Sequence, residues 1–287
     1  MVCKGRISLN MPINILRFIV LQLLILAGFN ASSQKWEIGG MLGLSNYNGD
    51  LARDIVLKES HFAGGAFLRY NLGKYFSLKP AIQIGTISGD DKNFKDNNQR
   101  NLSFRSNITE LSGMMEVNFR PFGAQVRTES FTPFIEFGLA AFHFNPKAEY
   151  NGDKFSLQNL HTEGQSKAYK LTQLSIPFGM GLKWSVNDNF TVGFEFVYRK
   201  TFTDYLDDVS KTYPDLVEQS KTYGPVSAAL SDRSVEVAGV TSPLSTQNEM
   251  RGDPGLKDWY VFSMFSFSYR FTPILCWPNK PNVIWDY

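Results

Sequence analysis

Large apolar residues alternate with small or polar residues along most of the chain after residue 35. In the first such segment, one set of positions holds Trp36, Ile38, Leu42 and Leu44, and the other holds Glu37, Gly39, Met41 and Gly43. Successive side chains of a β-strand point to opposite faces, so a period of two predicts a strand. The segment is therefore expected to be a strand with one apolar face and one polar or small-residue face.

The same alternation recurs along the rest of the chain. Further segments with this pattern span residues 62–70, 76–87, 108–120, 132–144, 171–184, 190–200 and 259–271. With the first segment this makes eight strands, and eight is the smallest even number found in outer-membrane barrels. We predict an all-β fold, an eight-stranded antiparallel outer-membrane β-barrel.

The predicted connections alternate between long and short. The long ones span about residues 46–60, 88–107, 145–170 and 201–258, and the short ones span about 71–75, 121–130 and 185–189. Short periplasmic turns and long extracellular loops are typical of outer-membrane barrels, and this arrangement would place both termini in the periplasm. A soluble, lipocalin-like barrel is the alternative, although it need not show this asymmetry.

The N-terminus has the pattern of a signal peptide. Lys4, Arg6 and Arg17 precede an apolar run over residues 18–27, and small residues follow at 31–33. A membrane-anchor helix is the alternative, but the run is about half of the roughly twenty residues that a spanning helix needs. We expect a signal peptide over 1–33, an outer-membrane β-barrel over 34–272 and a periplasmic tail over 273–287.

The polar faces of the strands carry charged residues of both signs. If the apolar faces contact lipid, the lumen receives Glu37, Arg69, Lys79, Glu116, Arg120, Glu136, Lys183, Glu195, Arg199 and Arg270. The interior of an eight-stranded barrel is just wide enough to be filled by its own side chains. We therefore predict a lumen charge network that closes the barrel by ion pairing, with a selective pore as the alternative interpretation.

The composition argues against several other functions. The net charge is +2 with both signs interspersed, which leaves no basic patch for nucleic acid. The three histidines, His61, His143 and His161, lack the spacing of metal ligands, and no serine is marked as a nucleophile. We expect a protein that is not an enzyme, with no catalytic, cofactor-binding or metal-binding residues.

Two features of the predicted loops leave alternatives open. Acidic residues where strands meet long loops could bind divalent cations that bridge lipopolysaccharide, or could cap turns. They are Asp50, Asp90, Asp91, Asp204, Asp207 and Asp208. On the longest loop, Arg251-Gly252-Asp253 has the sequence of an adhesion tripeptide, which common residues also produce by chance.

The cysteines suggest a contact near the C-terminus. Cys3 would be removed with the signal peptide, so Cys276 would be the one thiol of the mature chain and no internal disulfide could form. Cys276 and its neighbour Trp277 follow the last strand and would lie in the oxidising periplasm. An intermolecular disulfide with a partner and a free cysteine under the barrel mouth are both compatible with the sequence.

Several stretches, in order, resemble a known family. They are residues 36–40 (WEIGG), 46–50 (NYNGD), 88–91 (SGDD), 101–106 (NLSFRS), 144–148 (FNPKA), 162–165 (TEGQ) and 199–209 (RKTFTDYLDDV). Together they resemble the PorG-like outer-membrane barrels of Bacteroidota, which are components of the type IX secretion system and are often described only as a domain of unknown function. The resemblance covers nearly all of the mature chain.

The resemblance implies a role in assembly. It implies a barrel that contacts the periplasmic ring of the secretion system, built from a lipoprotein and its partner, with no catalysis and no cofactor. The ring lipoprotein would then be the partner of Cys276. The alternative is an orphan outer-membrane barrel that acts as a surface enzyme, adhesin or receptor.

Overall fold

The computed structural model describes residues 36–52, 55–94, 97–122 and 130–271, so the expected signal peptide and the tail with Cys276 and Trp277 lie outside it. Eight long strands account for most of the described chain. They are β1 (Trp36–Asn48), β2 (His61–Asn71), β3 (Phe76–Asp90), β4 (Ser103–Asn118), β5 (Phe131–His143), β8 (Thr172–Ser185), β9 (Phe190–Thr201) and β10 (Trp259–Arg270). Each predicted strand corresponds to one of them.

The eight strands form a closed antiparallel barrel. The order around the wall is β3-β2-β1-β10-β9-β8-β5-β4, and pairing of β3 with β4 closes it. The first and last strands pair over most of their length, from Glu37 opposite Arg270 to Asn48 opposite Trp259. Every long strand therefore has a neighbour on both sides, which removes the free edges that an open sheet would leave.

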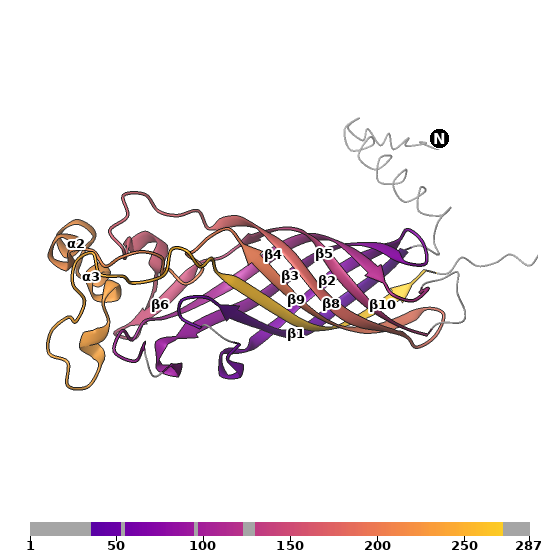
Figure 1. Ribbon diagram of the computed structural model, residues 1–287, viewed down its shortest axis with the longest axis horizontal. Coiled ribbons are helices and arrows are strands. Elements are labelled where there is room, and N and C mark those ends of the chain that lie inside the picture. The colour runs from indigo at the N-terminus through magenta and orange to yellow at the C-terminus, as the bar shows by residue number, and fades with distance from the viewer. Residues whose placement is uncertain (1–35, 53–54, 95–96, 123–129, 272–287) are drawn as a thin grey trace, which may run out of the picture.

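The two ends of the barrel are built differently (Figure 1). At one end, which we call the turn end, lie the described residues of the connections 72–75, 119–130 and 186–189. Trp36, which starts β1, and Phe271, which follows β10, share a backbone hydrogen bond at this end. At the other, the loop end, lie the described residues of the connections 49–60, 91–102, 144–171 and 202–258. The predicted short and long connections therefore lie at opposite ends, but the connections 91–102 and 119–130 are equal in length, so the predicted difference in length does not hold for that pair.

The outer wall is apolar because the outward positions of each strand are occupied mainly by large hydrophobic side chains. Exposed wall residues include Ile38, Leu42, Leu68, Leu78, Ile82, Ile84, Leu111, Ile135, Phe137, Leu139, Leu174, Phe178, Met180, Leu182, Phe194, Phe265 and Phe267. Leu42 is 69% exposed and Leu139 is 71% exposed, although both lie in mid-strand. Exposed aromatic residues are concentrated near the turn end: Phe76, Phe119, Phe131, Trp184, Phe190, Tyr269 and Phe271.

The loop end is folded and covers the barrel mouth. The connection 202–258, here called the cap, contains α2 (Leu216–Tyr223), α3 (Pro225–Ser231) and the 3-10 turn η7 (Ser234–Glu236). Asp215 starts α2 by accepting hydrogen bonds from the N–H groups of Val217 and Glu218. Such a side-chain cap satisfies two of the orphan donors of the first helical turn. None of the helices in the described ranges is long and apolar enough to cross a membrane.

Other connections at the loop end are also structured. The hairpin of β6 (Pro146–Tyr150) and β7 (Asp153–Ser156) extends the sheet, because β6 pairs with the start of β4. Single 3-10 turns lie at η3 (Leu57–Glu59), η4 (Asp91–Asn93) and η6 (Leu157–Leu160).

Strands β3 and β4 are longer than predicted. They pair as far as Asp90 opposite Ser103, so the connection between them spans only 91–102. Their outward residues near this end are polar, as in the pair of Thr86 and Asn107, whose side chains form a hydrogen bond of 3.0 Å. The apolar alternation therefore stops before the strands do, which is why the pattern underestimated them.

Candidate functional site

The half of the lumen nearer the turn end is filled by ion pairs. Arg69 of β2 lies 2.8 Å from Glu37 of β1 and 2.8 Å from Glu116 of β4. Glu37 also receives Arg270 of β10 at 2.9 Å. These strands alternate apolar residues outward, so their charged residues of the other parity are directed at one another across the lumen.

A second set of contacts extends this network across the barrel. Lys79 of β3 lies 2.6 Å from Glu136, 2.8 Å from Glu195 and 3.4 Å from Glu116. Lys183 of β8 adds a contact of 2.6 Å to Glu116. Four carboxylates and four basic groups thus balance, and all eight side chains are almost completely buried: Glu37, Glu116, Glu136, Glu195, Arg69, Lys79, Lys183 and Arg270.

Arg199 lies in a smaller cluster nearer the loop end. It contacts Glu110 of β4 at 3.2 Å and donates to the side-chain oxygen of Gln83 at 2.7 Å. The hydroxyl of Tyr260 donates to the same Glu110 carboxylate at 2.5 Å. The predicted lumen charge network did not include Glu110. Glu110 lies on the same face of β4 as Glu116, and this shared face is the signal that would have identified it.

Arg120 does not belong to the lumen charge network. Strand β4 ends at Asn118, and Arg120 is exposed in the connection beyond it. Its backbone N–H bonds the hydroxyl of Thr132 instead of continuing the ladder. The prediction for Arg120 was wrong because the parity rule holds only while the chain stays in the sheet.

Above the charged layer, apolar and aromatic side chains fill the lumen. The buried cluster includes Met41, Phe67, Phe104, Phe142, Tyr260, Phe262 and Met264. Cations lie against these rings: the Arg69 guanidinium is 4.8 Å from the Phe67 ring centre, and that of Arg199 is 4.4 Å from the Phe262 ring centre. The interior is thus closed by two successive layers, one charged and one aromatic.

The acidic residues at the strand–loop junctions are used as structural hydrogen-bond acceptors. Asp91 binds the Arg100 guanidinium at 2.6 Å, and Asp90 accepts from the N–H of Lys92. Asp204 accepts from the hydroxyl of Ser210 at 2.7 Å. No group of three or more Asp, Glu, His or Cys residues in the described part of the chain has the arrangement of a metal site.

Asp208 is held inside the cap. Its carboxylate accepts from the hydroxyl groups of Thr162 and Tyr169, and Arg251 lies 3.8 Å away. Burial raises the pKa of Asp208 to about 6, and the Arg251 charge partly offsets this. Asp208 has a positive φ of 69°, which Asp and Asn adopt more readily than most residues.

Two carboxylates of the cap meet one tyrosine of the barrel wall. The hydroxyl of Tyr47, on β1, lies 2.6 Å from Asp207 Oδ2 and 2.9 Å from Asp258 Oδ1. All three side chains are buried. Through these contacts both ends of the cap are attached to the mouth of the barrel.

The arginine of the adhesion-like tripeptide is buried, whereas Asp253 is exposed. Arg251 is 3% exposed, and its guanidinium contacts Glu163 and donates to the backbone carbonyl groups of Asp208 and Ser231. A receptor could not reach this side chain without opening the cap. Of the histidines, His61 binds Ser88, His143 binds Thr172 and His161 contacts the carbonyl of Gln165.

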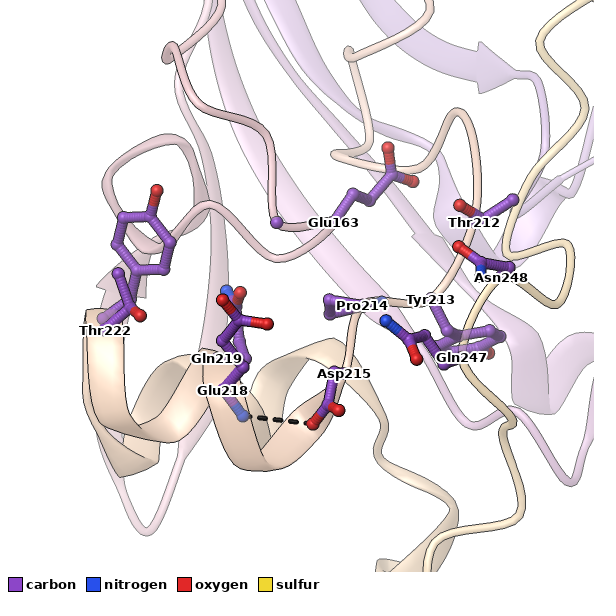
Figure 2. A pocket seen from close by; sticks show the side chains of 12 residues that line it. Glu163, Thr212, Tyr213, Pro214, Asp215, Glu218, Gln219, Thr222, Gln247 and Asn248 are labelled. Carbon is purple, nitrogen blue, oxygen red and sulfur yellow. Dashed lines mark hydrogen bonds between the residues drawn. The ribbon is translucent and has the colours of Figure 1, made fainter.

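A pocket of about 290 Å³ opens beside α2 (Figure 2). Gln219 and Glu218 of α2 lie on one side of it, Gln247 and Asn248 lie opposite, and Glu163 is at its rim. The rings of Tyr213 and Tyr223 complete the lining, to which no lysine or arginine contributes. The pocket is thus rich in amide and carboxylate groups with aromatic walls.

Comparison with solved structures finds other barrels at low similarity. The attachment invasion locus protein Ail of Yersinia pestis is 11% identical, with 83% of this chain and 99% of that chain covered and a TM-score of 0.41. Neisserial surface protein A is 8% identical over 82% of this chain and 97% of its own, with a TM-score of 0.41. The outer membrane protein OprG of Pseudomonas aeruginosa is 11% identical over 83% and 97%, also with a TM-score of 0.41.

Sequence comparison gives a family assignment. No curated protein matches the chain. Residues 16–225 match the family described as a domain of unknown function, DUF6089, and this region includes the strands from β1 to β9 and helix α2. The chain is therefore a member of the DUF6089 family.

Proposed function

We propose that this protein is an outer-membrane barrel that serves as a structural or assembly component of the type IX protein secretion system and is not a channel or an enzyme. The observation that carries the proposal is an apolar outer wall around a lumen filled by ion-paired and aromatic side chains. A soluble protein rarely exposes an apolar surface of this extent, whereas lipid would cover it. Because the lumen is filled, the barrel would anchor the protein in the outer membrane and would not transport molecules through its interior.

The secretion role is supported by the resemblance to the PorG-like barrels. Most of the stretches that carry this resemblance lie at the loop end, where Tyr47 bonds Asp207 and Thr162 bonds Asp208. In the proposed orientation the loop end faces the outside and the turn end faces the periplasm. The turn end, with the tail that follows Phe271, would then contact the periplasmic ring.

Deletion of the gene tests this role. We expect loss of surface delivery of type IX cargo, with normal amounts of other outer-membrane proteins, and restoration by the wild-type gene. Normal surface delivery in the deletion strain would contradict the secretion role. Adjacency of the gene to those of the secretion ring would provide independent support.

The contact with the ring is proposed to involve Cys276 and Trp277 of the tail. One unpaired thiol in an oxidising compartment can form an intermolecular disulfide. Non-reducing electrophoresis of membranes should show a larger band that disappears with reductant and in a Cys276→Ser variant. Migration of the wild-type protein alone would contradict the covalent link, and normal secretion after truncation at Phe271 would contradict docking by the tail.

A surface receptor is the second candidate, favoured by the pocket beside α2. Carboxylate and amide side chains between two tyrosines offer many hydrogen bonds and no positive charge, which suits a neutral or cationic polar ligand. Binding of neutral glycans to the purified barrel should weaken at least tenfold in a Tyr213→Ala variant. An equal response in a Val217→Ala control, on the exposed face of α2, would contradict a specific site.

A further inference from the structure

The contact between Tyr47, Asp207 and Asp258 requires one more hydrogen than the tyrosine can supply. A tyrosine hydroxyl donates a single hydrogen bond. Its oxygen is nevertheless within hydrogen-bond distance of two carboxylate oxygens, at 2.6 and 2.9 Å. One of these contacts must therefore use a hydrogen from a protonated carboxyl group, which donates to the tyrosine oxygen.

The other oxygens of the two carboxylates are already acceptors. Asp207 Oδ1 accepts from the N–H of Val209, and Asp258 Oδ2 accepts from the N–H of Leu206. The oxygens beside Tyr47 are thus the places where the extra hydrogen can reside. The same contacts fix the start and the end of the cap against β1.

Arg100 is close enough to Asp207 to lower its pKa partly, but neither Arg100 nor another basic side chain forms an ion pair with either carboxylate of the pair in the described part of the chain. The ionisable groups that act on the pair come from four elements: Asp50 from the β1–β2 connection, Arg100 from the β3–β4 connection, Tyr169 from the β5–β8 connection and Asp204 from the cap. Arg100 is itself bound to Asp91, and Asp204 lies 3.9 Å from Lys257. Most of the groups that act on the pair are acidic, which favours a neutral pair over two negative charges.

We propose that Asp207 and Asp258 share one proton, held against the Tyr47 hydroxyl, and that release of this proton unlocks the cap from the barrel mouth. The pair with Tyr47 is called the latch below. Burial raises the pKa of both aspartates well above the usual range, and the neighbouring carboxylates Asp50 and Asp207 raise them further. In the opened cap both side chains would be solvated and would ionise at their ordinary pKa of about 3.9.

Opening at neutral pH therefore releases one proton. By linkage, the equilibrium constant for opening should rise about tenfold per pH unit, until the pH at which the closed latch itself ionises. Hydrogen exchange at the amides of Leu206 and Val209, which the latch carboxylates bind, reports this opening directly. Exchange rates would be corrected for the intrinsic pH dependence with an unfolded peptide of the same sequence.

The test compares three variants with the wild-type protein in lipid vesicles between pH 6.5 and 9. An Asp207→Asn side chain supplies the missing hydrogen permanently, because its amide can donate to Tyr47 while its oxygen still accepts from Val209. Asp207→Asn should therefore remove the pH dependence of cap opening, and Asp258→Asn should do the same. An Asp215→Asn control, at the N-terminus of α2 and away from the latch, should keep the wild-type dependence.

The double variant Asp207→Asn with Asp258→Asn separates proton sharing from a general charge effect. Both amide side chains would then donate to the Tyr47 hydroxyl, and the hydrogen of that hydroxyl would have no acceptor. The amides of Leu206 and Val209 should therefore lose protection from hydrogen exchange at every pH. Protection in the double variant equal to that of the single variants would overturn the proposal. The proposal would also be overturned if opening of the wild-type cap did not vary with pH. The same holds if opening of the Asp207→Asn cap varied with pH as strongly as in the wild-type protein.

Infrared spectroscopy keeps the proposal testable if a variant does not fold. The wild-type protein should show the carbonyl band of a protonated carboxyl group at pH 7, and this band should disappear when the latch ionises at high pH. A folded Asp258→Asn protein should lack it. Absence of the band from wild-type protein at pH 7 would refute the shared proton.

Discussion

At the residue scale, the central charges of the lumen, Arg69, Lys79, Glu37 and Glu116, each have more than one partner. Arg69 binds Glu37 and Glu116, and Glu116 also receives Lys79 and Lys183. A buried charge is costly unless its hydrogen bonds and ion pairs are complete, so the network acts as a unit. Removing one member leaves charges of the opposite sign without compensation.

Replacement of Arg69 by methionine should destabilise the barrel strongly. It keeps much of the side-chain volume but leaves Glu37 and Glu116 without their shared guanidinium, which should cost about 3–5 kcal/mol of unfolding free energy. The measurement is urea unfolding in lipid vesicles. An Arg105→Met control, at an exposed position of β4, should change the free energy by less than about 0.5 kcal/mol. Equal losses in both variants would show that burial of the charge is not the cause.

Asp208 should make the stability of the cap depend on pH in the acidic range. Its pKa is raised to about 6 in the folded protein, against about 3.9 in an unfolded chain, so between these values the folded state binds more protons. Its contribution to stability is present below about pH 4 and is lost as the pH rises to about 6. The shift corresponds to roughly 3 kcal/mol. In an Asp208→Asn variant, proteolysis of the cap should lose this part of its pH dependence, and an unchanged profile would contradict the assignment.

The parity of charged residues along the strands was readable from the sequence, but their partners were not. Glu37 and Arg270 share a face with the small and polar residues of their strands, which placed them in the lumen. Lys79 lies between Glu136 and Glu195. This contact depends on how strands that are far apart in the chain face each other across the barrel. Such contacts follow from the stagger of the closed sheet, which strand patterns alone do not specify.

At the scale of elements, the loop end contains more regular structure than the pattern predicted. The β6–β7 hairpin turns at Asn151 and Gly152, both with positive φ, and Asn-Gly is a strong signal for a tight hairpin. Helix α2 follows Asp215 with Glu218 three residues later, a recognisable N-terminal signature. Both signals lie in short elements without a long apolar period, so the alternation of apolar and polar residues does not reveal them.

Excision of the hairpin should affect only the upper part of β4. The hairpin pairs with β4 at Arg105 and Ser106, whereas the rest of β4 pairs with β3 and β5. A variant with residues 146–156 replaced by a short Gly-Ser turn should keep a folded barrel. Hydrogen exchange should speed up at residues 103–106 and stay unchanged at 110–117. Unfolding of the whole barrel would show that the hairpin has a larger role than its pairing indicates.

At the scale of the whole molecule, an apolar wall encloses a polar and aromatic interior, the inverse of a soluble barrel that faces water. Every long strand is paired on both sides, so unfolding must break a closed ring of ladders. Such barrels resist detergent until they are heated. Unboiled protein from outer-membrane fractions should therefore migrate differently from boiled protein on electrophoresis, and identical migration together with recovery in the soluble fraction would contradict a membrane barrel.

The closed interior also predicts the behaviour of the barrel in a bilayer. Ion pairs around Arg69 and Lys79 fill one layer, and the rings of Phe142 and Phe262 fill the next, so removing the cap does not by itself open a path for ions. Purified protein in planar bilayers should show no steady conductance, and a variant with residues 210–256 replaced by a short linker should also stay closed. An outer-membrane porin measured in the same bilayers provides the positive control. Steady channels in the wild-type protein would refute the closed lumen. Channels in the shortened variant alone would show that the cap closes the barrel, and the latch would then control its opening.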